Sequence, residues 1–327
     1  PAVPPLRVEI TTIDGIVTLR GTTDNLLTKE RAERIAETVK GVRSVVNLIH
    51  VTPPLDRTDA AIEEDVKKAL LADPATDSYE VYPEVEDGKV TLTGSVESWT
   101  EKHLSEQVTA GVRGVKEVQN EVTVEPRSDR YDVEIERDIE QALRWDVLVD
   151  HGLISVDAED GHVTLSGIVG SAAEKREASY NAWVAGVRSV DASQLEVARW
   201  ARDEDLREPE FDYTADQEIE DAVEDALLFD PRVLTSDISI DSDGGVVTLR
   251  GSVETLKARR AAAGVAQNTH GVTRVENRLR VRMENPPTDR QIASDVHDAL
   301  QMDPFVDAEG IMPLVVNGAV TLSGTVD

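Results

Sequence analysis

The chain contains no cysteine and few aromatic residues: its 327 residues include 3 Phe, 5 Tyr and 4 Trp. Without cysteine there is neither a disulfide framework nor a thiolate metal site. The absence of cysteine fits an oxidising compartment and a reducing one alike. No apolar run approaches the roughly 20 residues that a membrane-spanning helix needs. The sequence therefore predicts no transmembrane segment in the visible chain.

Basic residues are also scarce, with 34 Lys and Arg against 64 Asp and Glu, so the formal net charge is −30. This charge repels nucleic acid and anionic bilayers at long range, and salt weakens the repulsion. The tryptophans are too far apart in the sequence to suggest a platform on which bases stack: Trp99, Trp145, Trp183 and Trp200. We expect no binding of nucleic acid.

Patterns that carry catalysis are missing as well. The six histidines form no His-x-x-x-His pair, and the Asp-rich turns lack the later glutamate of an EF-hand loop. The sequence has no glycine loop with a phosphate-binding lysine, no nucleophile elbow and no dinucleotide fingerprint. We therefore predict a protein that is not an enzyme and that uses no cofactor and no metal.

The chain does contain an internal repeat. The triplet Val-Thr-Leu occurs five times, with spacings of 73, 73, 84 and 73 residues, and each copy is followed two residues later by glycine. An Asp-Gly or Asn-Gly pair, which favours a tight hairpin turn, precedes each copy; these pairs begin at Asp14, Asp87, Asp160, Asp243 and Asn317. Self-similarity at a fixed period predicts a tandem array of one small module.

Other features keep register with the triplet. Apolar residues upstream follow one helical face, as in Ile62, Val66, Ala69 and Leu70, and three of these helices run into Asp-Pro. The third copy has Asp146-Val147 at this place. A second helix downstream of the hairpin ends near a glycine, and a Gly-Val pair then opens a third strand. The unit is therefore helix, strand, strand, helix, strand.

These landmarks predict the domain organisation. Complete modules span 58–124, 131–197 and 216–281; residues 1–51 form a partial module without the first helix, and residues 288–327 form one without the second helix and last strand. Residues 198–215 form an acidic linker. Its carboxylates either keep a linker solvated or offer a docking strip to a basic partner; they are Asp203, Glu204, Asp205, Glu208, Glu210 and Asp212.

The combination of an amphipathic helix, Asp-Pro, an Asp-Gly-x-Val-Thr-Leu-x-Gly hairpin and Gly-Val-x-x-Val-x-Asn resembles the BON family, the bacterial osmotic-shock and nodulation module. The third copy departs from it, because Asp191-Ala192 replaces the pair seen at Val46-Asn47. The resemblance implies an α+β fold in which two helices cover a three-stranded mixed sheet. It also implies a cell-envelope protein, periplasmic or extracellular, that binds phospholipid or other envelope components and protects against osmotic stress. A cytoplasmic location is the alternative, because the true N-terminus is not visible.

Basic residues gather in the fourth copy and predict a surface that binds anions or a protein partner. Three lie on its second helix and three alternate along its last strand, where period two places them on one face; they are Lys257, Arg259, Arg260, Arg278, Arg280 and Arg282. The alternative is an ordinary exposed face whose charge is balanced by nearby carboxylates.

A second functional hypothesis treats the modules as structural beads of an extracellular or envelope assembly. The opening helix of the last segment would then be an inter-subunit helix that completes the first segment of another copy, giving a head-to-tail filament. Its apolar face carries Ile292, Val296, Ala299 and Leu300. Truncation of a longer protein is the simpler explanation of the two partial modules.

Overall fold

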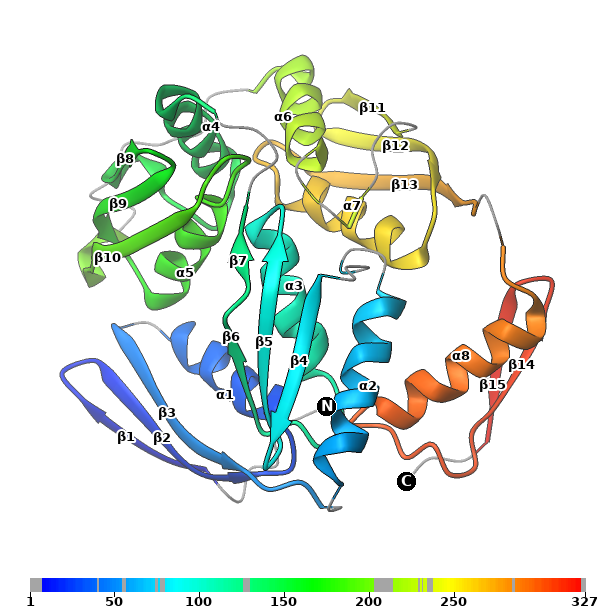
Figure 1. Ribbon diagram of the computed structural model, residues 1–327. Helices are drawn as coiled ribbons and strands as arrows, with labels where there is room; N and C mark the ends of the chain where they lie inside the picture. The colour runs from blue at the N-terminus through cyan, green and yellow to red at the C-terminus, as the bar shows by residue number, and fades with distance from the viewer. Residues whose placement is uncertain are drawn as a thin grey trace.

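The computed structural model describes residues 8–39, 41–54, 57–73, 76, 80–125, 130–202, 214–228, 230, 232–233, 238–283 and 286–324. The five copies of the repeat form five modules, numbered 1 to 5 in chain order (Figure 1). They comprise the described residues of 8–54, 57–125, 130–202, 214–283 and 286–324. The predicted acidic carboxylates between Asp203 and Asp212 lie outside the described residues.

The secondary structure follows the predicted order. Module 1 contains β1 (Val8–Ile13), β2 (Ile16–Thr23), α1 (Leu26–Glu37) and β3 (Ser44–Val51). Module 2 contains α2 (Asp59–Ala72), β4 (Val81–Glu86), β5 (Lys89–Val96), α3 (Trp99–Ala110), β6 (Glu117–Asn120) and β7 (Thr123–Val124). Module 3 contains α4 (Asp132–Trp145), β8 (Ile154–Glu159), β9 (His162–Val169), α5 (Ala172–Asn181) and β10 (Ser189–Val197), with 3-10 turns at His151–Leu153 and Arg199–Arg202.

The last two modules complete the array. Module 4 contains α6 (Asp216–Leu228), β11 (Ile238–Asp243), β12 (Val246–Val253), α7 (Leu256–Asn268) and β13 (Arg274–Val281). Module 5 contains α8 (Asp289–Met302), β14 (Met312–Val316) and β15 (Ala319–Ser323). In module 4, β11 is antiparallel to β12 and β12 is parallel to β13, while the buried Val247 and Leu249 face the helices. The predicted α+β fold, with helices on a small mixed sheet, is confirmed.

The hairpin turns use residues in the left-handed region. Asp14 and Gly15 have φ angles of 49° and 77°, and the Asp-Gly or Asn-Gly pairs of modules 2, 3 and 5 repeat this geometry. In module 4 the predicted pair Asp243-Gly244 is wrong by one residue, because Gly244 and Gly245 take the two positive φ angles and Asp243 ends β11. Glycine adopts this conformation without a steric penalty, so the Gly-Gly pair is favoured over Asp-Gly.

A first-turn aspartate clamps each of these hairpin turns to the opening helix. In module 3 the two carboxylate oxygens of Asp132 accept the backbone N–H groups of Asp160 and Gly161 at 3.0 and 2.9 Å. The same pair of bonds reaches Asp59, Asp216 and Asp289 in the other modules with an opening helix. The helix start and the hairpin turn are therefore held together by one side chain.

An asparagine fixes the third strand to the second helix. In module 4, Asn277 donates to the carbonyl oxygen of Arg259 at 2.7 Å and accepts the backbone N–H of Leu279. Asn47 and Asn120 do the same in modules 1 and 2. Module 3 has Ala192 here, whose side chain can neither donate nor accept a hydrogen bond, and β10 shows a bulge between Asp191 and Gln194.

Apolar side chains form separate clusters that follow the repeat. Module 3 is built around Ile135, Ile139 and Leu143 of α4, all fully buried, and modules 2 and 4 have equivalent clusters. Leu26 at the start of α1 joins the cluster of module 2, so modules 1 and 2 share an apolar contact. Module 5 has no fully buried apolar side chain among its described residues, and the helix face carrying Ile292, Val296, Ala299 and Leu300 stays partly exposed.

The modules pack against one another. The sheets of modules 1, 3, 4 and 5 lie at the periphery, while α1, α5 and α7 face module 2 in the middle (Figure 1). Trp99 of module 2 stacks on Trp183 of module 3 with ring centroids 4.9 Å apart, and His103 stacks on Trp99. The expectation that the tryptophans stay dispersed is therefore wrong for this pair, because packing of two modules brings distant segments together.

Candidate anion-binding surface

The structure does not place the six predicted basic residues on one surface. Helix α7 covers the inner face of the module 4 sheet, where Leu279 of β13 is buried. Side chains alternate across a strand, so the arginines flanking Leu279 lie on the opposite, outer face. Lys257, Arg259 and Arg260 are on α7, whereas Arg278, Arg280 and Arg282 are exposed on the outer face or at its end.

The basic residues of α7 are largely committed to contacts inside the protein. Lys257 forms an ion pair with the buried carboxylate of Asp73 in module 2. Arg259 donates to the carbonyl oxygen of Asn277 at 3.4 Å. Arg260 lies at the edge of a cavity between modules. Lys257 therefore serves the packing of modules 2 and 4, Arg259 is bonded within module 4, and only Arg260 faces a cavity.

The outer face of the module 4 sheet carries more arginines than the sequence pattern indicated. Arg250 of β12 lies directly opposite Arg278 of β13 in the parallel register, and Ser252 lies opposite Arg280. Arg274 precedes them on the same face of β13 and is also exposed. Arg250 was missed because it lies on another strand and only the strand pairing brings it beside Arg278. Arg274 was missed although it lies on the same strand, where the alternation of side chains already places it on this face. We call Arg250, Arg274, Arg278, Arg280 and Arg282 the arginine face.

Two carboxylates partly neutralise this surface. Glu276 contacts Arg274 at 3.1 Å and Arg278 at 2.7 Å, and Asp241 contacts Arg250 at 3.4 Å. Such exposed ion pairs contribute about 0–1 kcal/mol each, so an incoming anion can displace them. Within the described part of the chain, Arg280 and Arg282 have no ion pair.

The arginine face is particular to module 4. The pair equivalent to Arg250 and Arg278 is Ser166 and Gln194 in module 3 and Arg20 and Leu48 in module 1. The residues equivalent to Arg280 are uncharged or acidic: His50, Thr123 and Glu196. The local charge therefore does not follow from the fold of the module, and it opposes the net charge of the chain.

Planar guanidinium groups bind phosphate and carboxylate groups through paired hydrogen bonds. The five guanidinium groups of the arginine face can contact several anionic groups at once. No group of three or more His, Asp or Glu side chains is placed to hold a metal ion among the described residues. In the same part of the chain, no helix is both long and apolar enough to cross a bilayer.

Comparison with known proteins identifies the repeat. The model of the BON domain matches residues 1–53, 58–126, 131–199, 215–283 and 288–327. Osmotically-inducible protein Y of Escherichia coli strain K12 is 32% identical over 121 residues, which are 35% of this chain and 60% of that protein. The alignment thus spans less than two thirds of the length of this relative.

Two solved structures share a lower similarity. The C-terminal domain of CdsD, the structural protein of the type III secretion system of Chlamydia trachomatis, is 16% identical and aligns over 59% of this chain and 91% of its own, with a TM-score of 0.18. Another structure of CdsD is 17% identical, over 62% and 93%, with the same TM-score. These values carry no functional argument. The family matches cover nearly the whole sequence in five consecutive copies, and the chain belongs to the BON domain family.

Proposed function

We propose that this chain is a non-enzymatic protein of the bacterial cell envelope that acts in osmotic stress and binds the phosphate groups of anionic lipids through the arginine face. The similarity to an osmotically inducible protein supports the stress role. The observation that carries lipid binding is the pairing of Arg250 with Arg278, next to Arg280, on an exposed face. The envelope location is an expectation from the family.

The net charge of −30 gives this binding an unusual dependence on salt. The screening length falls from about 30 Å at 10 mM to about 8 Å at 150 mM salt. Long-range repulsion between the acidic chain and the lipid surface is therefore lost before the short contacts of the arginine face. We expect binding to be strongest at intermediate salt, whereas a basic protein binds most strongly at low salt.

Flotation with vesicles of phosphatidylglycerol and phosphatidylethanolamine tests the proposal, with pure phosphatidylcholine vesicles as the zwitterionic reference. An arginine near a membrane surface contributes about 1 kcal/mol. The variant Arg250→Ala/Arg278→Ala/Arg280→Ala should therefore bind on the order of 100-fold more weakly. All three positions are exposed, so we expect little change in stability.

A matched control removes the same charge elsewhere. Arg20, Arg31 and Arg43 of module 1 are exposed, and their triple replacement by alanine also takes three positive charges from the chain. The control should float like the wild-type protein. Equal losses in both variants, or no preference of the wild-type protein for anionic vesicles, would contradict the proposal.

A structural subunit of an envelope assembly is a second candidate, and apolar surface at modules 1 and 5 favours it. In module 1, Ile10, Ile35 and Val39 are 64%, 53% and 55% exposed on the side where other modules carry their first helix. In module 5, α8 is such a helix, but Ile292 and Leu300 are only partly buried. A second copy could therefore place its α8 face on module 1.

The oligomeric state tests this candidate. Light scattering over a range of concentrations and negative-stain microscopy should show chains of increasing length. Ile35→Glu should abolish these chains by placing a charge on the apolar surface of module 1. Ile292→Glu should have the same effect by placing a charge on the apolar face of α8. A monodisperse monomer at all concentrations would exclude the assembly.

A further inference from the structure

A cavity of about 870 Å³ lies where modules 2, 3 and 4 meet. Helices α4, α5, α6 and α7 supply most of its wall, and Thr100 of α3 completes it. Small-molecule sites typically measure about 300–1,000 Å³, and they form preferentially where domains meet. The size and position of this cavity are thus those of a ligand site.

Contacts between the modules define the cavity. The backbone of Trp145–Val147 in module 3 pairs with Asn268–His270 in module 4: His270 donates to Trp145 at 2.7 Å and Val147 donates to Asn268 at 3.3 Å. Modules 2, 4 and 5 have proline at the position of Val147, and proline has no N–H to donate. Module 3 therefore departs from the repeat at the residue that links it to module 4.

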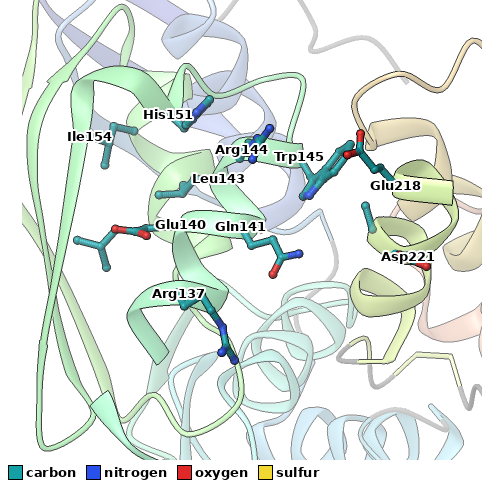
Figure 2. A pocket seen from close by; sticks show the side chains of 12 residues that line it. Arg137, Glu140, Gln141, Leu143, Arg144, Trp145, His151, Ile154, Glu218 and Asp221 are labelled. Carbon is teal, nitrogen blue, oxygen red and sulfur yellow. The ribbon is translucent and has the colours of Figure 1, made fainter. Parts of the chain in front are cut away.

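Aromatic side chains form part of the wall. Trp145, Trp183 and Tyr180 all line the cavity. Trp145 extends from the end of α4 toward α6, where it also lines another pocket of about 580 Å³ (Figure 2). One face of Trp183 is occupied by Trp99, and Tyr180 meets Trp99 edge to face. The aromatic groups are held in place by neighbouring modules and do not depend on a ligand for their position.

Carboxylates from two modules complete the lining. Burial raises the pKa of Glu177, and the nearby Asp146 raises it further. Burial likewise raises the pKa of Asp225, with a further contribution from Asp138. The contributions of Asp146 and Asp138 show that each of these two groups has a further carboxylate near it.

The basic residues of the wall are mostly committed to other carboxylates. Arg232 binds both oxygens of Asp230, and Lys257 is paired with Asp73. Arg137 contacts Asp138 at 3.3 Å. Arg260 is the main basic group left to oppose Glu177 and Asp225, so the cavity has more free negative charge than positive charge.

We propose that this cavity binds a small organic cation with an apolar body, such as a quaternary ammonium or a protonated amine. Aromatic faces attract such cations, and a desolvated site strengthens the attraction. Glu177 and Asp225 supply the opposite charge, and the acidic chain as a whole concentrates cations around it. The proposal uses a different surface from the arginine face and does not depend on lipid binding.

Calorimetry with three benzyl compounds of different charge tests the charge preference of the full chain: benzyltrimethylammonium, benzyl alcohol and phenylmethanesulfonate. We expect the cation to bind and the neutral and anionic probes to bind at least tenfold more weakly. Glu177→Gln keeps the shape of the side chain and should weaken the cation about tenfold. Glu84→Gln, an exposed site on β4, is the control for loss of one charge and should bind like the wild-type protein.

Gly264 of α7 offers a second test that does not involve charge. It lines the cavity, and a Cβ atom added there meets no atom within 4 Å. Gly264→Phe should fill the cavity and abolish binding, whereas Gly264→Ala should leave it intact. Retained binding in the Phe variant, preference for the anionic or neutral probe, or no binding of any probe would overturn the proposal.

Discussion

Replacement of Asp132 tests how strongly the aspartate clamp stabilises a module. Asp132→Ala removes two hydrogen bonds to a carboxylate, from Asp160 at 3.0 Å and from Gly161 at 2.9 Å. The Gly161 bond is partly buried and should contribute about 1.5 kcal/mol, and the exposed Asp160 bond about 0.5 kcal/mol. Loss of a negative charge from the first helical turn adds about 0.5 kcal/mol. We therefore expect module 3 to lose about 2–3 kcal/mol of stability.

Hydrogen exchange measured by mass spectrometry reports this loss within one module, because the amides of α4 and β9 exchange through opening of module 3. The loss should appear as roughly 30- to 150-fold faster exchange of those amides. Asp132→Asn retains an acceptor oxygen and should show about half the effect.

Glu140→Ala, at an exposed site in the middle of the same helix, is the control and should change stability by less than about 0.5 kcal/mol. If Asp132→Ala also stays within that range, the clamp does not contribute to stability. If exchange accelerates equally in all modules, the modules do not open separately.

Three further predictions follow from single residues. Val147→Pro removes the N–H that donates to Asn268, so exchange around residues 268–270 should rise while the core of module 3 stays protected. Gly167→Ala should destabilise module 3 by more than about 2 kcal/mol, measured by urea unfolding, because the residue has a φ of 123° and the new Cβ would lie 2.1 Å from the carbonyl oxygen of Leu153. The pKa of Asp216 is lowered by a hydrogen bond from Ser242 and by backbone N–H groups. The ionised side chain therefore stabilises the folded module above the unfolded pKa of about 3.9, and this stabilisation is lost as pH falls through the lower folded pKa. Asp216→Asn should flatten the dependence of urea unfolding on pH between about 2 and 5.

Much of the module could be predicted from the sequence because its determinants are local. The apolar face of α2 follows the 3.6-residue period, and Ile62, Val66 and Leu70 are all buried. The hairpin turns need two residues at positive φ, and Asp-Gly or Asn-Gly supplies them in four copies. The error in module 4 arose where the sequence offers two overlapping turn pairs, and local propensity alone separates Asp243-Gly244 from Gly244-Gly245 only weakly.

The surface could be predicted less well because its partners lie far away in the sequence. Alternation along β13 placed Arg278 and Arg280 on one face, but strand pairing was needed to add Arg250 beside them. Lys257 pairs with Asp73, which lies 184 residues away in another module. No periodicity within a single copy reports such a contact, so a helix residue that looks free for a ligand is in fact used for packing.

Differences between the copies carry the information that the shared pattern lacks. The clamp and the buried triplet recur in several modules and specify the fold of each one, so they cannot specify how unlike modules combine. That role falls to departures from the pattern, such as Val147 in place of proline, which bonds module 3 to module 4, and Trp99 and Trp183, which join modules 2 and 3. The arginine face is a departure of the same kind. Restoring the common residue at each of these positions should therefore remove an interface or a ligand surface while leaving the fold of the module intact.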